Sequence, residues 1–277
     1  GINPMDPTFR EAALAGITTV CTGPGSANVL GGTFTAIKTV GKRVDKMIVK
    51  KEVAMKCAFG ENPKRCYQDK NNYSRMSTAS KLREMLLKAR EYDRKVLAAD
   101  SDESKLPAYD MKLEALRPVL HGELFTALRI AQEFNVKITL EHVTEGHLIV
   151  DELKDEPVPM AVGPSLTHAS KFELRNKTFE TPGILANAGC QVSIITDSPV
   201  IPQQYLPLCA GLAIKSGMKE WDALKAITIN AAKHIGIEDR VGSLEIGKDA
   251  DILVMEGSCF EVSAQPEIVI IDGKVVA

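Results

Sequence analysis

Two polar residues in this sequence stand directly after short apolar segments. His142 follows VKITLE at residues 136–141, and Asp197 follows QVSIIT at residues 191–196. A single histidine or aspartate in such a place is more typical of a hydrogen-bonded loop or turn residue. Neutral imidazole and carboxylate are, however, ligands that zinc takes in hydrolytic sites. If the two segments are strands of one barrel, the pair predicts a metal site at the carboxyl ends of the strands.

A third ligand could come from MKCAFGENPKR at residues 55–65. Glu61 stands where this apolar segment runs into a turn, so it could bind the metal; its other interpretation is a turn carboxylate that caps the next element. Lys56 could carry a carbamate that bridges two metal ions, but a surface lysine on a strand edge is the simpler interpretation. We favour Glu61 because it lies nearer the end of the segment.

Other side chains are weaker candidates for a catalytic or binding role. His168 would contact substrate if the loop at residues 163–170 lies at the mouth of a barrel. Cys57 or Cys66 as a nucleophile is a less favoured alternative. The six cysteines form no CxxC pair and lie in apolar segments, which favours reduced thiols in a cytoplasmic protein.

Composition excludes several classes of partner. Over 277 residues the formal net charge is -2, with 44% hydrophobic and 25% charged residues, which predicts neither nucleic-acid nor membrane binding. No apolar run approaches the roughly 18 residues of a membrane span. The first residues have no basic and apolar signal-peptide pattern, and they lack an initiator Met, so we expect that the natural chain begins earlier.

Short apolar segments alternate with amphipathic ones over residues 1–235, which predicts a parallel sheet with helical crossovers. We expect a (β/α)8 TIM barrel there, although only about six strands are recognisable. A doubly wound sheet is the competing fold, and its GxGxxG turn is missing.

Residues 236–277 are β-rich and punctuated by glycine, which predicts the C-terminal part of a small β-sandwich domain. The expected strands cover residues 17–22, 47–50, 54–59, 136–141, 158–162 and 191–195, and the expected helices residues 77–97, 123–134, 146–153, 181–188, 206–216 and 219–234.

Several blocks of the sequence resemble one enzyme superfamily. Residues 223–257 (ALKAITINAAKHIGIEDRVGSLEIGKDADILVMEG) are similar to the closing segment of imidazolonepropionase-like and dihydroorotase-like amidohydrolases, and internal blocks at 15–32, 55–65, 140–147 and 196–207 also match. The resemblance implies a barrel with a small β-sandwich, one or two divalent ions, usually zinc, and hydrolysis of a C–N bond. It makes His142 the metal ligand after the sixth strand and Asp197 the aspartate after the eighth, which is both ligand and proton carrier. Glu61 would be a bridging acid.

The sequence also departs from the family pattern. No HxH pair occurs, and the stretch with a fifth-strand histidine is missing where residues 116–123 run into 124–134. His121 is a tempting replacement, but it precedes the missing stretch. Ser198 and Ala169 stand where related sequences often carry histidine and a basic residue. Either segments of the full polypeptide are absent here or the chain is a degenerate relative; the first is favoured because deletion of a strand would open a barrel that depends on closure.

Two functions are expected from these observations. The first is a metal-dependent amidohydrolase that cleaves a C–N bond in a small, often cyclic amide or a dipeptide by means of a metal-activated water. The second is a catalytically silent relative that serves as a binding or assembly module. Substrate identity, metal identity and whether the protein forms a homo-oligomer stay open at this point.

Overall fold

The computed structural model describes residues 1–68, 74–99, 102–110, 113, 116, 123–125 and 128–277. It is a mixed α/β structure that divides into two compact units. Unit 1 comprises Gly1–Thr22, Thr35–Lys51 and Leu140–Ala277, and unit 2 comprises Gly23–Phe34 and Glu52–Thr139. The predicted alternation of strands and helices is confirmed, whereas the described residues do not show a closed barrel. The predicted boundary after residue 235 stays a prediction.

An antiparallel sheet forms the N-terminal part of unit 1. It has the order β1 (Thr19–Thr22), β3 (Thr35–Lys38) and β4 (Ile48–Lys50), with Thr19 opposite Lys38. Helix α1 (Pro7–Leu14) precedes it, capped by the Asp6 carboxylate, which accepts from the Thr8 amide, and α2 (Val44–Met47) leads into β4. β1 and β4 are the strands expected near residues 17–22 and 47–50, whereas β3 was not predicted.

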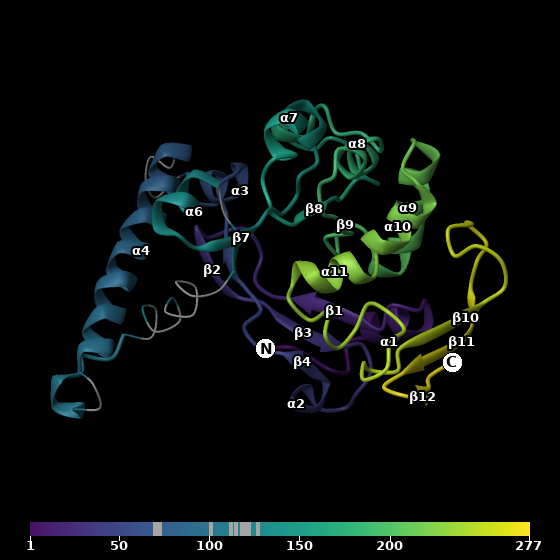
Figure 1. Cartoon of the computed structure of the whole chain (residues 1–277), viewed down its shortest axis with the longest axis horizontal. Coiled ribbons are helices and arrows are strands. Elements are labelled where there is room, and N and C mark those ends of the chain that lie inside the picture. Colours follow the sequence, from purple (N-terminus) through teal and green to yellow (C-terminus); the bar gives the residue numbers. More distant parts are fainter. Residues whose placement is uncertain (69–73, 100–101, 111–112, 114–115, 117–122, 126–127) are drawn as a thin grey trace. The chain divides into compact units, whose positions relative to one another are not determined.

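A parallel pair of strands forms the second sheet of unit 1. Strands β8 (Met160–Val162) and β9 (Val192–Ile194) are fully buried, and Leu140 pairs with Met160 as a parallel bridge beside them. Near-continuous apolar runs are typical of parallel strands buried on both faces. Helices α8 to α11 pack against β9 (Figure 1). The helical elements of this part are η2 (Gly146–Ile149), α7 (Val150–Leu153), η3 (Phe172–Leu174), α8 (Thr181–Asn187), η4 (Gln203–Tyr205), α9 (Leu206–Lys215), α10 (Glu220–Ala226) and α11 (Ile229–His234).

The single helix expected over residues 219–234 is two helices, so that prediction was wrong. Thr228 has φ -130° and ψ -101°, outside the helical region, and it separates α10 from α11. Its hydroxyl donates to the Leu224 carbonyl at 2.6 Å. Threonine bonds of this kind compete with helix propagation, a competition that hydrophobic periodicity does not register.

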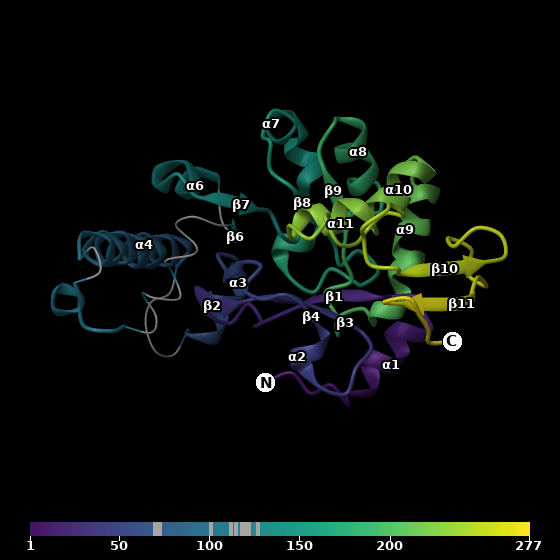
Figure 2. The ribbon, with the colours of Figure 1, turned by 60° about the horizontal axis from the view of Figure 1, so that its bottom comes forward.

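The C-terminal tail forms an antiparallel sheet of β10 (Ile252–Met255), β11 (Pro266–Ile271) and β12 (Lys274–Val275). Val269 and Ile271 are buried with Ala13 of α1, and α1 contacts β11 (Figure 2). The tail therefore packs on the N-terminal part of unit 1, because it has too few apolar residues to bury a core of its own.

A buried lysine ties the tail to the first sheet. The Lys38 ammonium is 3% exposed and lies 3.0 Å from Asp249, 2.7 Å from Asp251 and 3.3 Å from Asp272. Burial opposes the charge, but the hydrogen bonds to Asp251 and Asp249 outweigh it and raise the pKa of Lys38. A buried charge is retained in a fold when such partners surround it.

Unit 2 has a mixed four-stranded sheet in the order β2 (Leu30–Thr33), β5 (Met55–Cys57), β6 (Glu123–Phe125) and β7 (Lys137–Thr139). β5, β6 and β7 are parallel, and β2 is antiparallel to β5. The helical elements whose bounds the described residues give in this unit are α3 (Glu61–Cys66), α4 (Arg75–Ala98), η1 (Glu103–Lys105) and α6 (Leu128–Phe134). The helix predicted over residues 123–134 was wrong at its start, because residues 123–125 pair on both sides as β6.

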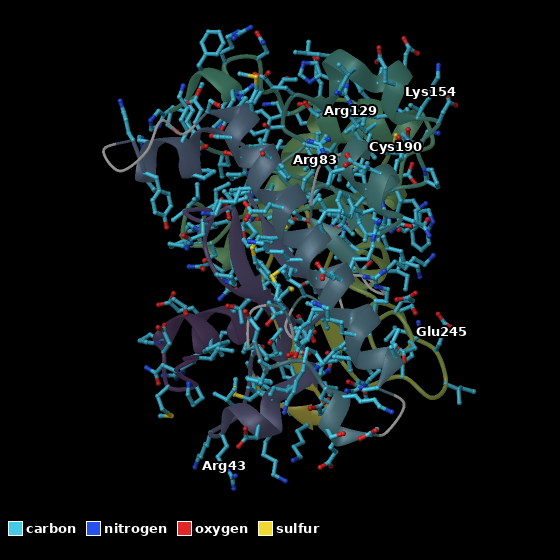
Figure 3. The ribbon with its side chains drawn as sticks, turned by 90° about the vertical axis from the view of Figure 1, so that its left-hand side faces the viewer. Arg43, Arg83, Arg129, Lys154, Cys190 and Glu245 are labelled. Atoms are coloured by element: carbon cyan, nitrogen blue, oxygen red, sulfur yellow. The ribbon has the colours of Figure 1, made fainter. Side chains whose placement is uncertain are left out.

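The long helix of unit 2 confirms the prediction over residues 77–97. Its N-terminus has a capping box in which the side chains of Ser74 and Ser77 bond each other's backbone amides. Arg83, labelled in Figure 3, donates from Nε to Glu133 at 2.6 Å and so links α4 to α6. Leu82 and Leu86 lie fully buried on the face that the sequence pattern indicated.

Candidate functional site

The structure brings His142 and Asp197 together at the ends of neighbouring strands. His142 follows Leu140, which pairs with β8, and Asp197 follows β9 by three residues. The carboxyl ends of parallel strands meet at one edge of a sheet, so both side chains reach the same place. His142 Nε2 lies 4.0 Å from Asp197 Oδ1, and both side chains are partly exposed.

Both residues have left-handed backbone conformations. The φ angle is 59° at His142 and 51° at Asp197. A residue with a Cβ occupies this region at a cost of about 1–2 kcal/mol, and histidine and aspartate are among the residues that tolerate it best. Such strain persists where the surrounding structure imposes it, which is common at active sites.

The carbonyl of Gly163 orients the imidazole. His142 Nδ1 lies 3.1 Å from this oxygen. A carbonyl can only accept, so Nδ1 carries a hydrogen, and in the neutral imidazole the lone pair is then on Nε2, the nitrogen that lies toward Asp197. This is the arrangement in which a histidine binds a metal ion through Nε2.

The two donors fit one metal ion in part. Zinc lies about 2.0–2.2 Å from imidazole nitrogen and carboxylate oxygen, so two of its ligands are at most roughly 4.4 Å apart. The 4.0 Å separation is within this limit. Catalytic zinc usually has three protein ligands, and the described part of the chain contains no group of three or more His, Cys, Asp or Glu side chains placed to hold a metal. His142 and Asp197 therefore make an oriented but incomplete ligand set.

The candidates from residues 55–65 lie in unit 2. Glu61 is the first residue of α3, and Gly60 rather than Glu61 is the N-cap residue, so the capping role of the alternative interpretation is not observed. Lys56 is not the surface lysine of the simpler interpretation: it is 7% exposed in β5, and its ammonium lies 5.8 Å from the centre of the Phe34 ring. The metal role of Glu61 stays a prediction.

Sequence reasoning missed a buried hydrogen-bonded pair beside His142. Glu141 Oε1 bonds His234 Nε2 at the end of α11, and the His234 side chain is 6% exposed. Burial, and then the Glu141 charge, raise the pKa of the Cys21 thiol to about 12. The two residues of the pair are 93 positions apart; the only sequence signal was a carboxylate adjacent to the candidate ligand His142.

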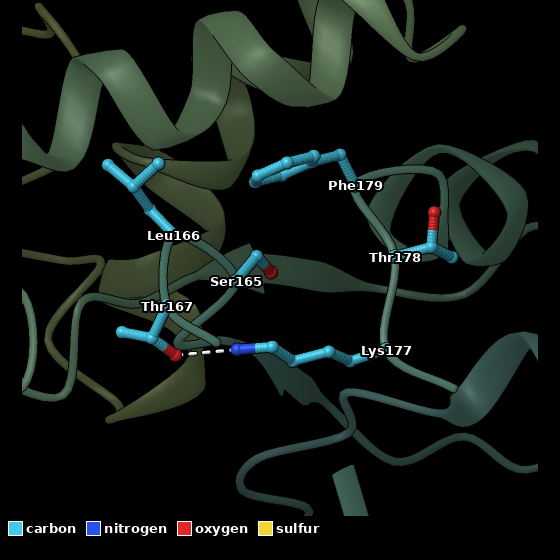
Figure 4. A pocket seen from close by; sticks show the side chains of 6 residues that line it. All are labelled: Ser165, Leu166, Thr167, Lys177, Thr178 and Phe179. Atoms are coloured by element: carbon cyan, nitrogen blue, oxygen red, sulfur yellow. Dashed lines mark hydrogen bonds between the residues drawn. The ribbon is translucent and has the colours of Figure 1, made fainter. Parts of the chain in front are cut away.

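A hollow opens beyond the Gly163 loop. Its volume is about 490 Å³, and Figure 4 shows its lining. The residues that line it are Ser165, Leu166, Thr167, Lys177, Thr178 and Phe179. His168, the predicted substrate contact, is exposed and follows Thr167 without lining the hollow. Its role stays a prediction.

Three weaker candidates remain. His121 lies outside the described residues. Cys57 is buried, and burial raises the pKa of its thiol, while Cys66 is exposed. A nucleophilic cysteine requires a thiolate, so the environment of Cys57 opposes that role.

The chain has relatives among characterised sequences and solved structures. The sequence profile described as "Amidohydrolase family" matches residues 10–276. An amidohydrolase from Thermotoga maritima has a TM-score of 0.94 and 38% identity over 100% of this chain and 76% of its own. Amidohydrolase tasK of Hapsidospora irregularis is 26% identical over 312 residues, 99% of this chain and 32% of its own length. Imidazolonepropionase of Thermoplasma volcanium is 32% identical over 114 residues, 40% of this chain and 28% of its own.

The same matches show that the relatives have parts with no counterpart in this chain. The chain spans about a third of the length of these curated relatives. The alignment with the tasK protein is longer than the 277 residues of this chain, so that relative holds segments within the matched region that have no counterpart here. The profile match along nearly the whole sequence and the similarity to the Thermotoga structure agree: the chain belongs to the amidohydrolase family.

Proposed function

We propose that the polypeptide to which this chain belongs is a metal-dependent hydrolase that cleaves a C–N bond in a small amide or dipeptide. The observation that carries the proposal is the pairing of His142 Nε2 with Asp197 Oδ1 at 4.0 Å. Family membership supports the reaction class, and the strand-end position of both residues supports their roles. We also propose that the strands belong to a TIM barrel and that the protein is cytoplasmic, which six cysteines without a CxxC pair favour.

His142 and Asp197 would hold a divalent ion, with zinc favoured by the nitrogen and oxygen donors. Such an ion, when bound, lowers the pKa of a water and polarises a carbonyl. The Gly163 carbonyl would keep the imidazole turned so that Nε2 stays a ligand. Asp197 would take the proton of the attacking water on its carboxylate and return it to the leaving nitrogen. The 44% exposure of its side chain gives solvent access to that carboxylate.

The test uses the full-length polypeptide. We expect nearly stoichiometric zinc or a similar ion by elemental mass spectrometry, and hydrolysis within a panel of cyclic amides and dipeptides. Asp197→Asn should lower kcat by about 10²–10⁴-fold because it removes the proton carrier. Asp155→Asn, which changes an exposed aspartate, is the control and should retain full activity.

Two results would refute the proposal. One is a metal-free preparation as active as the untreated one, and the other is an Asp197→Asn variant with unchanged kcat. A folded full-length protein that binds panel compounds but hydrolyses none would favour the silent binding module instead. The incomplete ligand set of the described residues is the observation behind that alternative.

A further inference from the structure

The hollow beyond Gly163 has two chemically different sides. Lys177 and Thr167 meet on one side, where the ammonium donates to the threonine Oγ1 at 2.5 Å (Figure 4). Leu166 and Phe179 form the opposite side, and Ser165 lies between the two. The Thr178 hydroxyl already accepts from the Glu180 amide at 3.3 Å. The hollow therefore offers one cation and hydroxyl groups facing an apolar wall.

The charge of Lys177 is not balanced within the described residues. Its ammonium contacts neutral acceptors, Thr167 Oγ1 at 2.5 Å and the Pro164 carbonyl at 3.5 Å, and no described carboxylate lies within 4.0 Å. Partial burial without a counter-ion lowers the pKa of Lys177. An ammonium has three donors, and withdrawing it from water without an anionic partner is unfavourable. An oxyanion in the hollow would supply that partner.

The Gly163–Pro164 dipeptide contacts both Lys177 and the candidate metal ligand His142. The Gly163 carbonyl accepts from His142 Nδ1 at 3.1 Å, and the next carbonyl, that of Pro164, accepts from Lys177 at 3.5 Å. Successive carbonyl oxygens are a few ångströms apart, so the ammonium and the imidazole are separated by no more than roughly 12 Å. A group bound at Lys177 and a bond cleaved near His142 can therefore belong to one small molecule.

We propose that this hollow binds a carboxylate of the substrate through Lys177, with a neighbouring apolar group of the substrate against Leu166 and Phe179. The inference rests on the proposed function and narrows it to amides with a free carboxylate, such as N-acyl amino acids with apolar side chains. Charge-assisted hydrogen bonds from an ammonium to a carboxylate are stronger than neutral ones. The hollow should accordingly discriminate between an acid and its uncharged amide.

The experiment compares N-acetyl-leucine with N-acetyl-leucinamide, which differs by the loss of the charge. Binding to the metal-loaded full-length protein is measured by calorimetry and by ligand-detected NMR. We expect the acid to bind at least tenfold more tightly than the amide. Equal affinities, or binding of neither compound, would overturn the proposal without any substitution being made.

Substitutions then locate the effect. Lys177→Met should weaken binding of the acid about tenfold or more and leave the amide unaffected, while Lys177→Arg should keep most of the discrimination. Lys171→Met is the matched control, because Lys171 is on the same segment but does not line the hollow. Thr167→Val, which leaves the charge in place, gives a second variant if Lys177→Met does not fold. A Lys177→Met protein, shown to be folded by its melting curve, that still prefers the acid would contradict the inference.

The readouts separate this inference from the proposed function. Tight, Lys177-dependent binding of the acid in a protein that hydrolyses nothing would support the hollow and defeat the hydrolase. Hydrolysis of acids and amides with equal kcat/KM would support the hydrolase and defeat the hollow.

Discussion

Gly163→Ala tests whether the orientation of His142 depends on the close approach of two strands. Gly163 has φ +146°, and a Cβ built there would lie 2.1 Å from the Ile195 carbonyl oxygen. The Ile195 amide donates to the Val162 carbonyl at 3.1 Å, so this residue belongs to the backbone that joins the strand ends. The contact cannot be relieved by rotation of a side chain, and the strands must move apart.

Two terms set the expected cost. Placing alanine in this backbone region costs about 1–3 kcal/mol. Forcing a methyl group into packed backbone costs about 1–3 kcal/mol more. The free energy of unfolding should therefore fall by roughly 4 kcal/mol. This is a large fraction of the total free energy of unfolding of a folded protein, which is typically about 5–15 kcal/mol. Displacement of the Gly163 carbonyl should also weaken metal binding about 10–100-fold, because the imidazole loses its orienting acceptor.

Urea unfolding of the full-length protein and a competitive metal titration measure these two effects. Gly189→Ala is the matched control, since Gly189 has φ +93° and a Cβ added there would meet no atom within 4 Å. It should show the conformational cost of about 1–2 kcal/mol without the collision. If Gly163→Ala unfolds no more easily than Gly189→Ala and binds metal equally well, the reasoning about strand approach and imidazole orientation is refuted.

Further substitutions test the ion pairs around Lys38 and the cysteines. Lys38→Met should lower the free energy of unfolding by about 3–5 kcal/mol, because it leaves the largely buried Asp251 carboxylate without its cation, whereas Asp249 keeps Arg240; a urea-unfolding loss below about 1 kcal/mol would contradict this. Burial tends to raise the pKa of Asp249, but hydrogen bonds from Lys38 and Arg240 outweigh it and hold the pKa below 3.8, so this carboxylate stabilises the fold above that value and the stabilisation is lost as the pH falls through the folded pKa. Unfolding titrations from about pH 5 to 2 should show a smaller acid loss for Asp249→Asn than for the unsubstituted protein. Iodoacetamide should modify exposed Cys66 and spare Cys57, as read by peptide mass spectrometry, and Cys66→Ser should keep full activity.

The local sequence pattern was enough to predict many helices and strands and the proximity of His142 and Asp197. The amphipathic spacing at residues 77–97 predicted α4, and apolar runs predicted β8 and β9 to within two residues. His142 and Asp197 could be selected because both follow such runs, and parallel strands bring their ends together. Their roles in binding metal stay predictions.

The features that the sequence did not predict depend on distant contacts or on single side chains. β6 has only three residues, and its extended form is set by pairing with β5 and β7 rather than by periodicity. The break between α10 and α11 comes from one threonine hydroxyl. Glu141 and His234 meet across the fold, and Lys177 faces Thr167 through loop geometry that no spacing rule describes.

The Lys38 cluster has a consequence for how unit 1 assembles during synthesis. Lys38 is translated roughly 200 residues before Asp249, Asp251 and Asp272, and its ammonium needs their carboxylates before it can be buried. Contacts of such sequence separation form slowly because a long loop must close first. The strands of the first sheet, which all lie within residues 19–50, emerge early, whereas Lys38 stays without its carboxylate partners until the tail is synthesised. Truncation of about the last thirty residues should accordingly release a nascent chain in which the Lys38 ammonium has lost all three carboxylate partners.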